Sequence, residues 1–315
     1  MEAFIVMFRN VLVFLALAVP GYLLVKLNII KDKDTPPLSK VLVKVGLPAL
    51  VFSNSLSMDL KGEATIKLAI VAIVTFIFIL LTVILSSLFT KNFGDRSVQV
   101  TAKYAMSFSN SGFLGIPLAT AVFGVSPVLD YVVVCNVVCC VMLNTLGVYV
   151  FTGDKKVISL KRIFLNPTFI FFVLGILINL TGVLTYVPEI SLFASHLSGV
   201  VTPISMMIVG IKFAEVKPLD IFKSKNMYVV SLVKLLIQPI MAVGLVLIIN
   251  VFVPFSSAII LGLFMALSMP SPGTTSSFAD MYDGDVDGSV IYTLGSTILS
   301  VITIPLLYNL LTFII

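Results

Sequence analysis

Long apolar runs separated by short polar stretches follow one another along almost the whole chain. Each run is close to the roughly 20 residues that an α-helix needs to cross a bilayer. We count ten such runs, which cover residues 4–25, 38–57, 66–90, 104–123, 128–151, 164–184, 190–213, 227–253, 257–279 and 288–313. The pattern therefore predicts an all-α integral membrane protein of ten transmembrane helices with no soluble domain between them. The first run lacks a small-residue cleavage site, and we interpret it as a retained helix.

Composition supports lipid as the solvent of this chain. Apolar residues make up 59% of the sequence and charged residues only 11%, against about 25% charged residues in soluble globular proteins. A water-soluble domain of this size could not bury so much apolar surface.

Basic residues are distributed unevenly between the two sides that the ten runs define. Sixteen Lys and Arg residues lie in or beside the loops between runs 1 and 2, 3 and 4, 5 and 6, and 7 and 8, which all fall on one side. The other side carries Arg9, Lys61 and Lys67. Because cytoplasmic loops are enriched in basic residues, we expect a plasma- or inner-membrane protein with both termini extracellular or periplasmic. The basic face is expected to meet anionic lipid headgroups, and nucleic acid is not implied.

Two prolines and one aspartate of the first half each have an identical residue 155 positions later. The pairs are Pro48 with Pro203, Pro117 with Pro272, and Asp130 with Asp285. Because five helices are an odd number, a second copy must enter the membrane from the opposite face. We therefore predict two inverted five-helix repeats, residues 1–153 and 154–315, of the kind found in many secondary transporters.

Runs 4 and 9 hold the corresponding positions in the two halves, and both contain Pro and Gly among hydroxyl and amide side chains, at residues 107–117 and 268–277. Proline removes a helical hydrogen bond and crowds the preceding turn, and glycine costs about 1 kcal/mol in a helix interior. Opened backbone is tolerated within a membrane only where it is buried in protein or lines a polar cavity. We therefore expect both helices to be broken near the middle of the membrane.

A broken helix exposes a half-helix N-terminus with free N–H groups and partial positive charge. Two such ends form an anion site, although the C-terminal ends at the same breaks favour a cation. The substrate-binding residues that we predict are Ser109, Asn110, Ser111, Gly112, Ser271, Thr274, Thr275 and Ser276. The residues predicted to keep the crossing helices open are Gly115, Pro117, Pro272 and Gly273. The competing interpretation is a pair of Pro-kinked packing helices.

Four further polar residues are candidates for coupling or for lining the pathway: Asn136, Asn144, Lys234 and Asp280. An ionisable residue within a span is a functional candidate, although Lys234 could also extend to the near membrane face. The two asparagines are equally suited to interhelical hydrogen bonds. Coupling to a proton or to sodium stays open.

Neither a cofactor nor a metal is expected. The three cysteines, Cys135, Cys139 and Cys140, share one apolar run without a His or carboxylate beside them. No HExxH, Gly-x-Ser-x-Gly or Walker motif occurs, so neither a hydrolase nor an ATP-driven pump is indicated.

The string from Asn110 to Leu118, followed by Phe123-Gly124, resembles the first crossover of the auxin efflux carrier family. Residues 278–282 and 304–308 resemble its C-terminal pattern, and the short central loop at 152–163 resembles the bacterial branch. The resemblance implies ten helices in two repeats, crossed helices 4 and 9, and elevator movement of helices 3–5 and 8–10 against helices 1, 2, 6 and 7. It also implies a small carboxylate substrate and a homodimer formed through the static helices.

These observations together predict a non-enzymatic secondary transporter, a permease or efflux carrier, of a small organic anion. A sodium-coupled symporter of the bile-acid type is the alternative within transport. A membrane sensor that keeps the carrier fold is the alternative outside it. An intramembrane enzyme would need a titratable pair, which the sequence does not offer.

Overall fold

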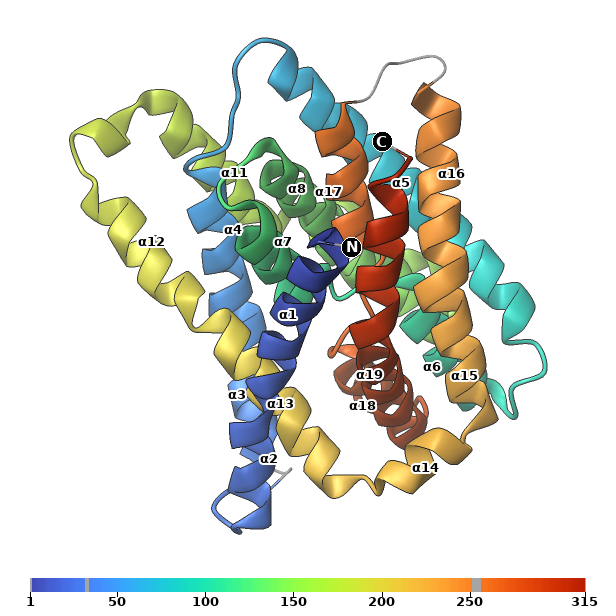
Figure 1. Cartoon of the computed structure of the whole chain (residues 1–315). Helices are drawn as coiled ribbons and strands as arrows, with labels where there is room; N and C mark the ends of the chain where they lie inside the picture. The colour runs from blue at the N-terminus through green and yellow to red at the C-terminus, as the bar shows by residue number, and fades with distance from the viewer. Residues whose placement is uncertain (1, 32–33, 251–255, 315) are drawn as a thin grey trace.

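The computed structural model describes residues 2–31, 34–250 and 256–314, and within these ranges every regular element is a helix (Figure 1). Seven helical runs of the described residues are long and apolar enough to cross a membrane. The predicted class, an all-α multi-pass membrane protein, is therefore confirmed.

The helices of the first half are α1 (Glu2–Ala16), α2 (Ala18–Lys26), α3 (Thr35–Val41), α4 (Leu47–Ser55), α5 (Glu63–Phe89), α6 (Arg96–Ser107), α7 (Ile116–Phe123), α8 (Pro127–Met142) and α9 (Val148–Thr152). Those of the second half are α10 (Leu160–Phe164), α11 (Pro167–Thr181), α12 (Glu189–Gly199), α13 (Val201–Glu215), α14 (Pro218–Lys223), α15 (Lys225–Leu232), α16 (Gln238–Asn250), α17 (Ser257–Leu267), α18 (Thr275–Met281) and α19 (Val286–Leu311). Four π-helical turns, η2 (Leu42–Gly46), η3 (Ser111–Gly115), η4 (Leu143–Gly147) and η7 (Val233–Ile237), join some of them.

The seven long helical runs correspond to predicted runs 1, 2, 3, 5, 7, 8 and 10. Run 6 is the shorter apolar helix Pro167–Thr181. Runs 4 and 9 are each divided into two helices, as their Pro and Gly content predicts. Residues 251–253, the predicted end of run 8, lie outside the described residues. The helix of run 4 begins earlier than predicted, at Arg96, because the Asp95 carboxylate accepts a hydrogen bond from the Val98 N–H and caps it.

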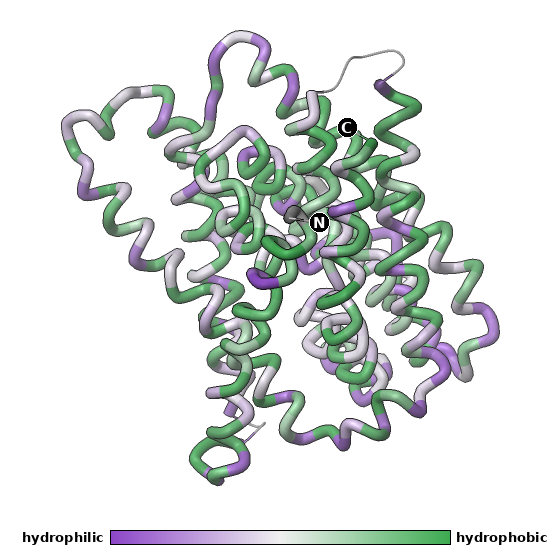
Figure 2. Tube along the Cα trace, viewed as in Figure 1, coloured by the Kyte–Doolittle hydropathy of each residue, from purple (hydrophilic) through white to green (hydrophobic). Residues whose placement is uncertain are grey.

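Hydrophobic residues predominate along the helices (Figure 2), and many of their large apolar side chains are exposed. Ile73 and Ile84 on α5, Leu177 on α11 and Ile248 on α16 are among the exposed ones. Soluble monomers rarely expose contiguous apolar patches of more than a few hundred Å². This surface is suited to lipid.

The helices form two packing groups. In the first, α2 packs against α13, and α4 packs against α11 and α12. In the second, α8 packs against α5 and α17, and α19 packs against α6, α15 and α18. The first helix, α1, packs mainly against α19 of the second group. These groups match the static and mobile sets implied by the family resemblance, except for α1.

Two glycines allow the closest approach within the first group. A Cβ at Gly21 of α2 would overlap the Met207 carbonyl of α13, and a Cβ at Gly210 of α13 would overlap the Ala18 carbonyl of α2. The two backbones therefore touch directly, as in small-residue crossings of membrane helices.

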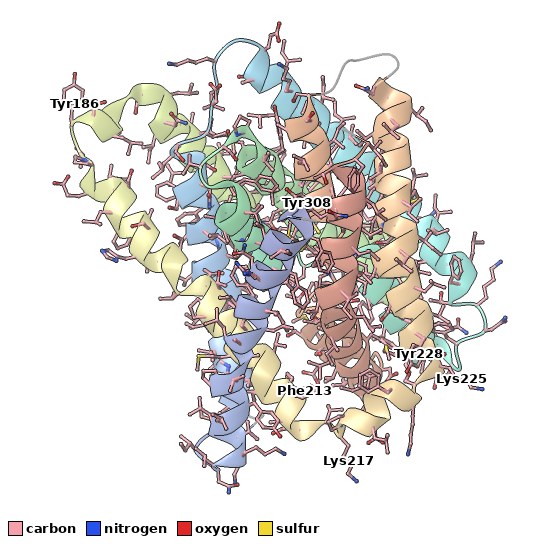
Figure 3. The ribbon with its side chains drawn as sticks, viewed as in Figure 1. Tyr186, Phe213, Lys217, Lys225, Tyr228 and Tyr308 are labelled. Carbon is pink, nitrogen blue, oxygen red and sulfur yellow. The ribbon has the colours of Figure 1, made fainter. Side chains whose placement is uncertain are left out.

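Basic residues collect at one end of the molecule. Lys217 and Lys225 lie at the lower end in Figure 3, where Figure 1 also places the connections from α2 to α3 and from α5 to α6. Tyr186 and the connection from α4 to α5 lie at the opposite end. Three of the four basic loops predicted to share one side therefore lie at the same end of the molecule.

Candidate functional site

The two broken helices meet at their breaks. Helix α6 ends at Ser107 and helix α17 at Leu267, and the chain resumes helical structure at Ser111 and Thr275. The Asn110 N–H donates a 2.9 Å hydrogen bond to the Pro270 carbonyl, and the Ser109 hydroxyl donates one of the same length to the Leu267 carbonyl. Backbone N–H and carbonyl groups that the two breaks leave without helical partners thus form some of their hydrogen bonds with the other break. The helix ends Ser107 and Leu267 are 160 residues apart, five more than the 155 residues that separate Pro117 from Pro272.

Prolines explain why several helices are widened near this crossing. Pro48, Pro117 and Pro239 each lie two residues beyond a π-helical turn. A proline cannot donate to the carbonyl four residues before it, and its ring crowds that carbonyl. The preceding turn therefore opens to the wider π spacing, which occurs often at functional sites.

Glycines let the breaks pack closely against neighbouring helices. A Cβ at Gly115 would lie 3.2 Å from the Met265 carbonyl oxygen of α17. A Cβ at Gly112 would lie 2.8 Å from Asn136 Oδ1 of α8. Gly273 is different, because no atom lies within 4 Å of the position that its Cβ would take. The first two glycines thus serve packing, and Gly273 faces open space.

Several buried polar atoms around the crossing have no hydrogen-bond partner within the described part of the chain. Ser268 Oγ, Ser271 Oγ and Thr274 Oγ1 lie in the second break, and Asn136 Nδ2 lies beside the first. The other end of the Asn136 amide accepts a 3.1 Å hydrogen bond from Ser111 Oγ. A buried polar group left without a hydrogen bond typically costs about 1–3 kcal/mol. Four such groups beside the two breaks make this region a candidate site for a polar ligand or water.

A small cavity of about 50 Å³ opens at the crossing. Asn110, Gly273, Thr274 and Ser277 line it from the two breaks. The first packing group contributes Ser39, Leu42, Val43, Ser205, Met206, Ile208 and Val209. Asn110 is only 6% exposed, and its side chain has no hydrogen-bond partner among the described residues. The cavity therefore lies between the two groups with a free amide on its wall.

Lys234, on the π turn η7, reaches the same crossing. Its ammonium is fully buried and donates to Ser109 Oγ at 2.6 Å and to Gln238 Oε1 at 2.9 Å. No carboxylate of the described residues lies within ion-pair distance of it. The side chain therefore points into the protein rather than toward a membrane face.

A larger cavity of about 530 Å³ is lined in part by the basic loop between runs 5 and 6. Among the described residues, three cations line it, Lys44 from η2 and Lys161 and Arg162 from α10, and no Asp or Glu does so. Asn144, Asn166, Thr168 and Thr274 add polar groups. Val43 and Thr274 line both cavities. We call the larger cavity the basic vestibule.

The remaining predicted residues lie apart from the small cavity. Thr275 Oγ1 donates to the Pro272 carbonyl at 2.6 Å, within its own turn. Ser276 accepts a 2.9 Å hydrogen bond from Ser289 of α19. Asn144 lines the basic vestibule and donates to the Cys140 carbonyl. Asp280 is exposed on α18 and lines neither cavity.

Sequence reasoning missed several residues of the site. Ser268 lies within the predicted second break but not among the predicted substrate-binding residues, and its buried hydroxyl has no partner among the described residues. Ser39 and Ser205 line the small cavity from helices that carried no local signal. Gln238 lies one helical turn beyond Lys234 in the sequence, but it was not predicted to be a site residue.

Comparisons with known proteins identify the class. Residues 6–160 match the family described as "Membrane transport protein", and residues 204–315 match the "Sodium Bile acid symporter family". An uncharacterized transporter of Methanothermobacter thermautotrophicus is 28% identical over 306 residues, which cover 95% of this chain and 96% of the relative. An uncharacterized transporter of Methanocaldococcus jannaschii is 26% identical over 211 residues, 65% of this chain and 68% of the relative.

With its apolar helices, these matches define a multi-pass membrane transporter. The match of residues 6–160 to the membrane transport protein family confirms the resemblance to the auxin efflux carriers.

Proposed function

We propose that this transporter is a secondary carrier of a small organic anion, in particular a carboxylate, which it binds where the two broken helices cross. The observation that carries the proposal is a set of buried hydroxyl and amide groups that have no partner among the described residues. They lie beside an ammonium that no carboxylate of the same part of the chain approaches. An anion with several acceptor oxygens would satisfy these donors. Hydrogen bonds to charged groups are also about twice as strong as neutral ones.

Helix ends reinforce the preference for negative charge. The turn that begins at Ser111 and the helix α18 that begins at Thr275 both start at the crossing. Their first N–H groups carry partial positive charge, which is little screened in a buried site.

The basic vestibule supplies a route for the anion from the side of the basic loops. Lys44, Lys161 and Arg162 would raise the local anion concentration. In our proposal this side is the cytoplasm, by the positive-inside rule. Both termini then face the outside of a plasma or inner membrane, and the chain crosses the membrane ten times as two inverted repeats.

Alternating access would follow from the two packing groups. The crossing belongs mainly to the group of α8 and α19, and the wall of the small cavity opposite it belongs to the group of α2 and α13. An elevator movement of one group along the other would carry the crossing from the vestibule to the opposite side. A homodimer formed through the first group would hold that group in place.

The match of residues 204–315 to the sodium bile acid symporter family favours sodium coupling as a second candidate. Sodium would bind beside the anion and move with it.

Asn110→Ala tests the anion site. The purified protein is first screened for thermal stabilisation against a panel of small carboxylates. Loss of one hydrogen bond to a charged group costs about 1.5–3 kcal/mol, so the variant should bind the stabilising anion on the order of ten- to a hundredfold more weakly. Asn10→Ala is the control, because Asn10 is bonded within its own turn of α1. Unchanged affinity in Asn110→Ala would place the anion elsewhere.

A further inference from the structure

Two side-chain oxygens of the crossing surround the Lys234 ammonium. They belong to the Ser109 hydroxyl, at 2.6 Å, and the Gln238 side-chain carbonyl, at 2.9 Å. Both oxygens are fixed as acceptors by their other bonds. The Ser109 hydrogen is directed to the Leu267 carbonyl at 2.9 Å, and the Gln238 amide nitrogen donates to the Met106 carbonyl at 2.7 Å. Lone pairs of both groups are therefore aimed at one point.

The position is also electrostatically suited to a positive charge. Leu267 is the last residue of α17, and Met106 lies one residue before the end of α6. The C-terminal ends of both broken helices, which carry partial negative charge, thus lie next to the Lys234–Gln238 pair. In transporters with broken helices, such ends and unwound carbonyls coordinate coupling cations.

We propose that the Lys234 ammonium permanently occupies the cation site of the crossing, so that the carrier moves its anion without a bound sodium ion. The lysine supplies the same single positive charge at the same helix ends, but it is covalently attached and cannot dissociate. Hydroxyl and amide oxygens, which suit hard cations, are already engaged by it. The inference rests on the proposed anion site, and it assigns to the chain the sodium-independent form of that function.

The test measures cation binding directly and needs no knowledge of the substrate. Thermal unfolding of the protein in lipid nanodiscs is followed as sodium replaces choline at constant ionic strength. The native protein should show no saturable rise in its unfolding midpoint. Lys234→Ala should unfold at a lower temperature, and methylammonium or sodium should restore the midpoint in a saturable manner by filling the vacated site. Lys225→Ala, which removes an exposed charge near the start of the same helical run, should do neither.

Two results would overturn the inference. One is a saturable sodium-dependent rise in the native protein that disappears in Ser109→Ala, because sodium would then share the crossing with Lys234. The other is a folded Lys234→Ala protein that responds to no cation. If Lys234→Ala does not fold, the sodium titration of the native protein and of Ser109→Ala decides alone. Failure of the anion site is recognised separately, by a carboxylate response that Asn110→Ala leaves unchanged.

Discussion

The role of a polar residue at the crossing depends on which of its hydrogen bonds are already made. The sequence predicts hydroxyls at Ser109, Ser111, Ser271 and Thr274 for the substrate without distinguishing them. In the structure the first two have partners, whereas the hydroxyl oxygens of the last two are buried with no partner among the described residues. Sequence could indicate the residue types, because they lie in broken apolar runs. It could not rank them, because their partners come from distant segments such as α8 and α17.

Two adjacent threonines offer a matched test of this distinction. Thr274→Val removes an unpaired hydroxyl, so we expect weaker anion binding with little loss of stability. Thr275→Val removes the bond to the Pro272 carbonyl, so we expect a loss of about 1 kcal/mol of stability and nearly unchanged affinity. Thermal unfolding with and without the stabilising carboxylate measures both quantities. The reverse pattern would show that Thr275, and not Thr274, faces the ligand.

At the scale of helices, the sequence predicts where each one is interrupted but not how closely two of them approach. The prolines of runs 4 and 9 predict both breaks, because a proline disrupts the helix in its own turn. The contact of α2 with α13 has no such local signal. Glycine is compatible with a close crossing, a turn or a flexible site, and only the position of the partner backbone distinguishes these uses.

Gly210→Ala tests the close crossing of α2 and α13. The added methyl would overlap the Ala18 carbonyl, and the helices must separate to admit it. Overpacking of this kind typically costs about 1–3 kcal/mol, and a lower unfolding midpoint in nanodiscs should report it. Gly244→Ala in α16 is the control, since its Cβ would meet no atom within 4 Å. Equal midpoints for the two variants would contradict the crossing.

For the whole molecule, the sequence predicts the class and the separation of charge, which depend on composition and segment order. The basic vestibule could not be predicted from the sequence. Lys44, Lys161 and Thr274 come from three distant parts of the chain, and only the folded arrangement unites them. The inverted repeats and the crossing of the membrane by all ten runs remain predictions.

Orientation in the membrane is tested by single-cysteine labelling of intact cells at two exposed positions, Ile158 and Val187. Val187 follows Tyr186 at the end opposite the basic loops. An impermeant thiol reagent added outside should label position 187 and not position 158, in a background without the three native cysteines. Permeabilised cells serve as the control, because both positions should react there. Labelling of position 158 alone would reverse the topology.

The basic vestibule should make transport depend on charge from one side only. Lys161→Gln/Arg162→Gln removes two of its three cations, whereas Lys155→Gln/Lys156→Gln removes two exposed charges from the same loop that line neither cavity. Electrostatic focusing raises the local concentration of an anion by roughly tenfold or more at low salt and is screened as salt increases. In proteoliposomes loaded with the carboxylate found by thermal shift, the first pair should raise KM several-fold from the vestibule side at low salt. The effect should shrink in about 1 M salt, where the Debye length is roughly 3 Å, and the opposite side should be unaffected. If the second pair raised KM equally, the net charge of the loop would be responsible, and the vestibule would have no specific role in collecting the anion.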